Sequence, residues 1–249
     1  MKAIYNNIVN TASLSASSEN PSYPLENLQD NLVASKYRTT SELAQGLVIS
    51  LASSQASYIF IDNHNITAGA TIQIQGNNTD VWGAPAFSEN ITHSSGLITH
   101  EFSAGVQTYN FWRLYINDAG NTDGYIEMGL IVLGHYVQFP GMSPDQSIPF
   151  SSTSRSTITD AGQVYGDEKP TYREFTVKLR NCTNTHRENI NTVWDANKNI
   201  YPLMLLIWSD ELDFEPPMYC VINQRGLKWK KSDNKNFPWD VTLKFREVL

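Results

Sequence analysis

Cysteine is scarce in this chain, which has two, Cys182 and Cys220, among 249 residues. Two cysteines in a chain of this length make no disulfide framework, so we expect free, buried thiols in a reducing compartment. Long apolar runs are absent as well, because the most apolar segment, 201–208, is far shorter than the ~20 residues that span a bilayer. The first ten residues also lack the apolar core of a secretory signal. These absences predict a protein without a transmembrane segment that is made and kept in a cytosol.

Catalytic signatures are missing too. The five histidines show no metal-binding spacing, and the sequence contains no His-Glu-X-X-His, Gly-X-Ser-X-Gly elbow, phosphate-binding glycine-rich loop or Cys-X-X-Cys. A pair of carboxylates in the acidic run 210–215 would suit a glycosidase. Acids crowded between two strands are more often a solvated turn, so we expect that the protein is not an enzyme, with a glycosidase as the least favoured alternative.

The chain does contain many acidic and aromatic residues. Its formal charge is −7 and its pI about 5.2, so phosphate backbones and anionic membranes should repel it. We therefore expect neither nucleic acid as a partner nor membrane insertion. The basic run 228–231 is interpreted as a hairpin loop or as a contact with the acidic surface of a neighbouring copy. Aromatic residues at 11% and charged residues at 17% are typical of an all-β protein.

Short β-branched or alternating runs follow one another between residues 46 and 133, with polar turns between them and no helical period of any length. This pattern predicts an antiparallel β-sandwich. A short helix is expected at 24–28, because proline suits the first helical turn.

The stretch 110–134 is expected to form the closing strand pair of this sandwich around a turn of Asn, Asp and Gly. Along its first strand, Trp112 lies on the apolar side of the alternation and belongs in the core. Arg113 and Tyr115 then face the other way.

After Gly134 the composition changes, with three prolines between 138 and 149 and a Ser/Thr-rich run at 151–159. Further on, the pattern predicts one helix at 183–194, capped by Thr183 or Asn184, and strands at 173–180, 201–208, 218–223 and 239–248. We therefore expect three parts: a β-sandwich at 1–137, an extended Pro/Ser-rich linker or arm at 138–160, and a smaller β-rich α+β docking domain with one helix at 161–249.

Several motifs of the first half occur in the order of a known family. They are the segment 16–31 with a strand, a short helix and an Asp-containing loop, then Tyr37-Arg-Thr-Thr, the runs 47–51 and 58–62, and finally 111–116 with 125–129. In this order they resemble the galactose-binding-like jelly roll, also known as the discoidin or coagulation-factor C-type domain, over residues 12 to 136. The resemblance implies a mainly β chain that begins with an antiparallel jelly-roll β-sandwich.

The closing motif, from Trp112 through 123–129 to Gly134, looks most like the version of this module in bacteriophage and prophage tail proteins. That likeness implies a non-enzymatic structural component of the virion tail, assembled in the cytoplasm of the bacterial host. Its partners would be other copies of itself, other tail proteins and a host-surface glycan. The alternative is a free-standing carbohydrate-binding module or adhesin.

Some members of the family hold a structural calcium, an ion that prefers hard oxygen ligands. The resemblance implies that Asp30 and Glu127 would be the calcium ligands in this chain, because they occupy the matching positions of the family motifs. The usual Asp-Gly of the family is Asp30-Asn31 in this chain, which departs from the pattern. The alternative is that Glu127 is paired with an arginine, either Arg38 or Arg113.

Sugar sites of this fold lie in loops at one end of the sandwich, where an aromatic ring stacks on the sugar and polar groups bond its hydroxyls. The resemblance therefore implies a glycan site with the candidate residues Trp82, His93, Tyr23, Asn117 and Asp118. Trp82 is the leading candidate, against the alternative that it is tucked under its own loop.

Overall fold

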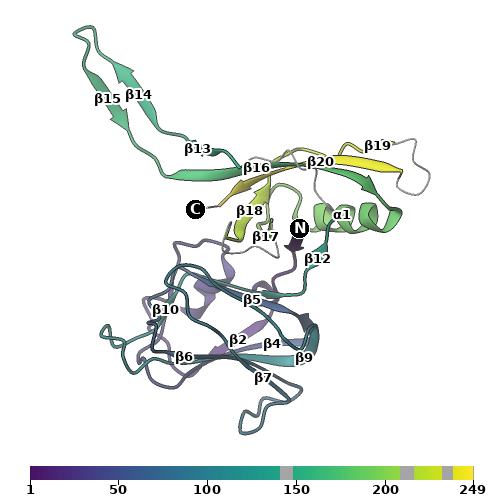
Figure 1. Cartoon of the computed structure of the whole chain (residues 1–249). Coiled ribbons are helices and arrows are strands. Elements are labelled where there is room, and N and C mark those ends of the chain that lie inside the picture. The colour runs from purple at the N-terminus through teal and green to yellow at the C-terminus, as the bar shows by residue number, and fades with distance from the viewer. Residues whose placement is uncertain (141–147, 208–215, 232–237, 249) are drawn as a thin grey trace. The chain divides into compact units, whose positions relative to one another are not determined.

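The structure is a computed structural model of the whole chain, and it describes residues 1–140, 148–207, 216–231 and 238–248 (Figure 1). The chain forms two compact units, one of Asn6–Tyr136 and one of Met1–Tyr5 with Val137–Leu249. They are named here the sandwich domain and the mixed domain. The acidic run expected to be a solvated turn, 210–215, and part of the proline-rich segment, 141–147, lie outside the described residues.

The sandwich domain contains two main antiparallel sheets. The five-stranded sheet has the order β2-β4-β9-β6-β7, with the bounds Ser13–Ala16, Gln45–Ala56, Gln107–Asn117, Thr71–Asn77 and Phe87–Asn90. The three-stranded sheet has the order β11-β5-β8, with the bounds Leu130–Gly134, Tyr58–Asp62 and Ile98–Glu101. A further pair joins β3, Tyr37–Arg38, to β10, Glu127–Met128, and two 3-10 turns cover Ile8–Asn10 and Leu25–Gln29. This architecture confirms the expected antiparallel β-sandwich.

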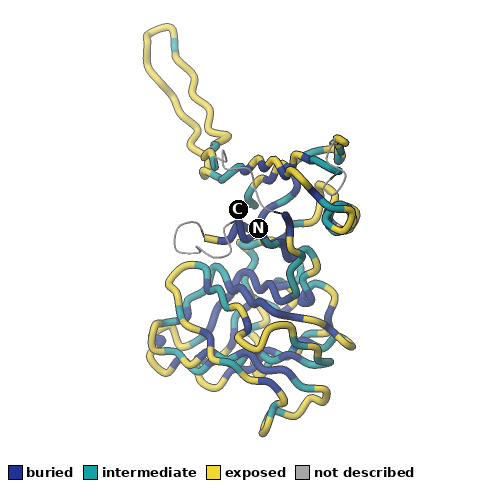
Figure 2. The backbone as a smooth tube through the Cα atoms, turned by 45° about the vertical axis from the view of Figure 1, so that its right-hand side comes forward, coloured by how far each residue is buried: buried dark blue, intermediate teal, exposed yellow. Residues whose placement is uncertain are grey.

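The core of the sandwich domain lies between these sheets. Alternate residues of β6 and β9 point into it and meet apolar residues of β5 and β11. Trp112 is fully buried there, as predicted, and its indole N–H donates to Ser54 Oγ at 3.0 Å. Figure 2 shows buried stretches through the middle of this domain and exposed stretches along its outer edges.

The predicted strand pair at 110–134 is wrong. β9 pairs with β4 and β6, whereas β11 pairs with β5, so the polar segment between them crosses from one sheet to the other. The second run is also broken at Gly129, where an added Cβ would lie 2.2 Å from the backbone oxygen of Val33, an approach that only glycine permits. A polar turn composition does not distinguish a hairpin from a crossing between sheets, because both need the same turn residues.

The mixed domain is an eight-stranded antiparallel sheet with the order β12-β1-β17-β18-β20-β16-β13, and β19 pairs with β20. The bounds in this order are Val137–Gln138, Lys2–Ile4, Leu203–Leu206, Met218–Ile222, Trp239–Glu247, Thr171–Cys182 and Phe150–Ser152, with Lys230–Lys231 for β19. Its one helix among the described residues, α1 at Asn184–Asn197, begins after Thr183, whose hydroxyl accepts from the N–H of His186. The expected helix and its cap are therefore confirmed.

The first residues of the chain belong to the mixed domain. β1 pairs with β12 and β17, and Met1 and Ala3 lie in the mixed core. The sequence-based division placed residues 1–137 in the sandwich, so it differs at Met1–Tyr5 and at Val137. A three-residue strand carries too little pattern to reveal partners that are distant in the sequence.

Part of the expected linker, 138–160, forms strands instead. β13 pairs with β16, and β14, Arg155–Ile158, pairs with β15, Val164–Asp167. All residues of β14 and β15 are exposed (Figure 2), and among the described residues these two strands pair only with each other. Residues 153–169 are named here the β14–β15 hairpin. The strands that pair with β13 and β14, namely β16 and β15, lie beyond residue 160, so the composition of the linker alone did not indicate the pairing.

Cys182 and Cys220 are free thiols in the mixed core, as expected. Burial raises the pKa of Cys182 to about 11 and that of Cys220 well above its usual value, so both thiols stay protonated at neutral pH. Among the described residues, α1 is the only α-helix, and no helix has the length and apolar character needed to cross a membrane.

Candidate functional site

The outer face of the five-stranded sheet carries a cluster of polar and aromatic side chains. Because side chains alternate along a strand, burial of Trp112 on β9 turns Arg113 and Tyr115 to the outer face. The register places Gln75 of β6 opposite Arg113 and Gln73 opposite Tyr115. The predicted outward direction of Arg113 and Tyr115 is confirmed.

Arg113 lies between two aromatic rings. Its guanidinium is 4.8 Å from the ring centroid of Trp82 and 5.3 Å from that of Tyr115, both within the range of cation–π attraction. Trp82 is half-buried in the connection between β6 and β7, and its indole N–H donates to Asp80 Oδ1 at 2.6 Å. The leading candidate is thus held by its own loop and contacts the sheet through Arg113.

A row of side-chain hydrogen bonds continues from Arg113 across the sheet. Arg113 Nε donates to Gln75 Oε1 at 2.7 Å, Gln75 Nε2 to Gln73 Oε1 at 3.1 Å, and Gln73 Nε2 to Asn90 Oδ1 at 2.9 Å. These bonds fix which end of each amide is the donor. We name this set the Arg113 platform: Trp82, Arg113, Tyr115, Gln73, Gln75 and Asn90. Gln75 is buried and bonded at both ends of its amide, so it positions Arg113 and Gln73 and is not itself a ligand contact.

Arg113 differs from the other cations of its domain. Three basic residues occur between Asn6 and Tyr136, all of them described, and Lys36 and Arg38 both pair with Glu127. Arg113 has no carboxylate partner in this range, and its Nη groups make no hydrogen bond to a described residue. Burial lowers its pKa, against the opposing effects of Tyr115 and Asp80, and the guanidinium stays charged at neutral pH. The platform therefore offers unused, charged donors.

Tyr23 belongs to a different cluster. The guanidinium of Arg38 lies 3.9 Å from the Tyr23 ring centroid and 4.1 Å from that of Tyr125. One face of Tyr23 is thus covered by a cation that is itself bound to Glu127. Stacking of a sugar on Tyr23 stays a prediction for its other face.

The remaining glycan candidates are bonded within the loops at the strand ends. His93 Nε2 lies 2.9 Å from a backbone carbonyl, and Asn117 Oδ1 accepts from a backbone N–H at 3.1 Å. Asp118 is fully buried, accepts from the Thr67 N–H at 2.8 Å and bonds the Thr67 hydroxyl and Asn121. A fully buried carboxylate does not reach a sugar, so Asp118 anchors its loop instead of acting as the predicted ligand.

The two residues expected to bind calcium do not fit that ion. Glu127 is 7% exposed, and its carboxylate bonds Lys36 through one oxygen and Arg38 through the other. Burial raises the pKa of Glu127, but the bonds and charges of the two cations outweigh it and hold the pKa below its usual value. Asp30 is exposed and accepts from the N–H of Leu32 at 2.8 Å. The described residues contain no group of three His, Cys, Asp or Glu that could hold a metal.

Gln73, Gln75 and Asn90 were not predicted as site residues. Their signal in the sequence is the alternation of Gln with Ile at 70–75, which indicates a polar outer face. The family resemblance places the sugar site in the loops, so it does not indicate a site on a sheet face. The row of amide hydrogen bonds also depends on the register between strands, and the alternation of residues within one strand does not determine that register.

No protein-family model matches the chain, and no curated protein sequence does. Among solved structures, it is similar to chitosan-binding module 1 of a chitosanase/glucanase from Paenibacillus sp. IK-5, at 14% identity over 52% of this chain and 99% of that chain, with a TM-score of 0.43. It is also similar to a family 32 carbohydrate-binding module from Clostridium perfringens in complex with galactose, at 14% identity over 55% of this chain and 100% of that chain, with a TM-score of 0.42. A fucose binding module from Streptococcus pneumoniae matches at 13% identity over 53% and 99%, also with a TM-score of 0.42. These neighbours are carbohydrate-binding modules.

Proposed function

We propose that the sandwich domain binds a carbohydrate and that the Arg113 platform is the binding surface. The observation that supports this most directly is the guanidinium of Arg113 between Trp82 and Tyr115, with its Nη groups unused and a row of amides beside it. Aromatic faces stack on the apolar faces of sugars, and guanidinium and amide groups bond hydroxyls in a fixed geometry. The platform thus combines both elements of sugar recognition on one sheet face.

The charge of the domain favours a neutral sugar. Between Asn6 and Tyr136 there are three basic and eleven acidic residues, which gives a formal charge of −8. A carboxylated or sulfated sugar would be repelled within a Debye length of roughly 8–10 Å at ordinary salt, whereas a neutral one would not. The proposed ligand class is therefore a neutral oligosaccharide on an open surface.

A glycan array with the whole chain would identify the sugar, and calorimetry would then compare variants. Trp82→Ala and Arg113→Gln should each weaken binding at least about tenfold, because each removes stacking or a charge-assisted hydrogen bond. Val81→Ala is the matched control, since Val81 is a neighbouring loop residue that is 61% exposed. Unchanged affinity in both site variants would overturn the proposal. Loss in His93→Ala with full binding in Arg113→Gln would instead favour the loop site.

A second function, as a structural component of a bacteriophage or prophage tail, is favoured by the β14–β15 hairpin. Its side chains Ile158, Val164 and Tyr165 are 69%, 67% and 64% exposed. An isolated two-stranded hairpin is marginally stable in water. Ile158 and Val164 are cross-strand partners on one face and Tyr165 lies on the other, so both faces carry exposed apolar side chains of the kind found at contact surfaces. In this role the hairpin would pack against other copies of the chain or other tail proteins in the virion.

Size-exclusion chromatography with light scattering tests this second function. We expect the whole chain to assemble, and Ile158→Ser with Val164→Ser to give a monomer, because these two residues face each other across the hairpin. Val106→Ser, at a 45% exposed valine of the sandwich domain, is the matched control. A parent chain that stays monomeric and does not co-assemble with tail proteins would contradict the structural role.

A further inference from the structure

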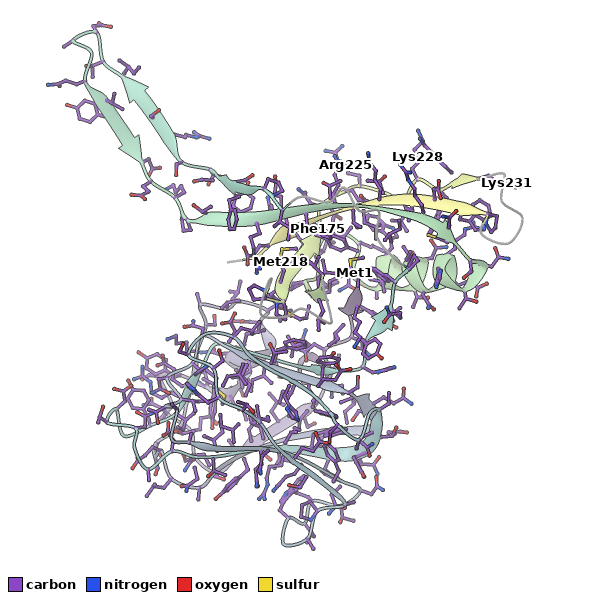
Figure 3. All side chains as sticks on the ribbon, viewed as in Figure 1. Met1, Phe175, Met218, Arg225, Lys228 and Lys231 are labelled. Atoms are coloured by element: carbon purple, nitrogen blue, oxygen red, sulfur yellow. The ribbon has the colours of Figure 1, made fainter. Side chains whose placement is uncertain are left out.

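The sheet of the mixed domain has one apolar and one basic face. On β16, Phe175, Val177 and Leu179 are buried in the core with Ile190 and Val193 of α1. Because strand side chains alternate, the residues between them face away from that core. Figure 3 shows Phe175 on the side of the sheet toward α1 and Lys228 on the opposite side.

A groove of about 360 Å³ lies on this opposite face. Its charged lining comes from β16, from β20 and from the segment that leads into β19, with these residues: Lys178, Arg180, Lys228, Lys230 and Asp240. We name it the basic groove. Its volume lies within the range of small-molecule sites in proteins, roughly 300–1,000 Å³.

The four cations of the basic groove outnumber the carboxylates among its lining residues. Asp240 is its one carboxylate, and Asp240 Oδ1 already accepts from the backbone N–H of Asn181 at 3.0 Å. Within the part of the chain that the structure describes, none of the four cations forms an ion pair. Like charges around one concave surface repel one another, and a bound anion relieves that repulsion. The arrangement thus favours an anionic ligand.

We propose that the basic groove binds an anionic sugar unit, carrying a sulfate, phosphate or carboxylate group, of an acidic polysaccharide. The anion follows from the charges of the groove. The choice of a saccharide as its carrier rests on the proposed carbohydrate function of the sandwich domain. The two domains then differ in ligand, because the acidic sandwich domain excludes the polyanion that the mixed domain attracts.

The test measures binding of the whole chain to a heparin-derived hexasaccharide by calorimetry. Three further probes are the desulfated hexasaccharide, inorganic sulfate and single-stranded oligothymidine. The sulfated sugar should bind most tightly, and its affinity should fall steeply between about 50 and 200 mM salt. Lys178→Glu with Lys228→Glu should weaken it at least about tenfold. Arg155→Glu with Lys169→Glu, the same charge change on the exposed hairpin, is the matched control and should leave it unchanged.

Several results would overturn the proposal. Unchanged affinity in the groove variant places the site elsewhere, and equal binding of oligothymidine favours a nucleic acid. Equal binding of inorganic sulfate favours a free anion, and a lower mass of the groove variant in light scattering favours a second copy as the occupant. If the variant with Lys178→Glu and Lys228→Glu has a lower melting temperature than the parent, the variant with Lys178→Gln and Lys228→Gln is used in its place. Trp82→Ala should leave the sulfated sugar unaffected, so failure at the groove is distinguishable from failure at the Arg113 platform.

Discussion

The two domains differ most in how they distribute charge. The sandwich domain has a formal charge of −8, whereas the mixed domain has fifteen basic and fourteen acidic residues and a charge of +1. Two of the three cations in the sandwich domain are paired with Glu127, whereas four cations of the mixed domain line one groove. The net charge of a chain therefore does not describe its individual surfaces. The repulsion of anions expected from a charge of −7 applies to one domain only.

The domains differ also in how firmly their connections and hairpins are held by buried residues. The connections of the sandwich domain are held by buried polar residues such as Asp118 and Asn121. The mixed domain instead has a hairpin whose strands are exposed throughout. We therefore expect perturbations of the sandwich domain to act on its own stability and perturbations of the hairpin to act on association.

The largest expected effect tests whether the two domains unfold separately. Trp112→Ala should destabilise the sandwich domain by about 3–5 kcal/mol, because it leaves a large cavity among Phe87, Phe102 and Tyr109. In urea denaturation followed by circular dichroism, the unfolding transition of the sandwich domain should shift to a lower urea concentration, and that of the mixed domain should stay unchanged. Trp82→Ala, at a half-buried surface position, is the control and should cost less than about 1 kcal/mol. A single transition that shifts as a whole would show that the domains unfold together.

A smaller effect is expected at the ion pair of Glu127. Glu127→Gln should cost about 1–3 kcal/mol, because it leaves Lys36 and Arg38 partly buried without their carboxylate. Since the folded-state pKa of Glu127 is lowered, its contribution is fully present above the unfolded-state pKa and is lost as pH falls through the folded-state pKa. The melting temperatures of parent and variant should therefore converge on acidification. Glu26→Gln, at an exposed glutamate, is the control, and a difference that grows on acidification would contradict the assignment.

The sequence predicted those elements whose pattern is complete within a short segment. The strands β4, β5, β6 and β9 follow from alternation, and α1 follows from its cap and apolar spacing. The strand β1 and the β14–β15 hairpin were missed, because three residues or a Ser/Thr-rich run carry little apolar pattern. At the candidate site, the sequence indicated Trp82 and the outward direction of Arg113, and it left the pairing of Glu127 with Arg38 open as an alternative. The amide row of the Arg113 platform and the basic groove depend on register between strands, which no single segment specifies.

The mixed domain should respond to a change at the helix cap without any change in the sandwich domain. Thr183→Ala should cost about 1 kcal/mol, because the N–H of His186 loses its acceptor at the helix start. Thermal unfolding should show a lower melting temperature for the mixed domain alone. The control is Thr192→Ala, since the Thr192 hydroxyl bonds a carbonyl inside the helix and contributes little there. An equal shift in both variants would contradict the capping role.

The smallest expected effect concerns calcium and the sandwich domain. A structural ion present at about ten times its dissociation constant would stabilise the folded domain by roughly 1.4 kcal/mol, which is several degrees in melting temperature. Because Lys36 and Arg38 bond both carboxylate oxygens of Glu127, we expect no shift at millimolar calcium and no loss of stability with a chelator. Differential scanning calorimetry of the parent and of Asp30→Ala measures this. A calcium-dependent rise that Asp30→Ala abolishes would show that the ion displaces the two cations, and the Glu127 carboxylate would then be a metal ligand in place of an ion-pair partner.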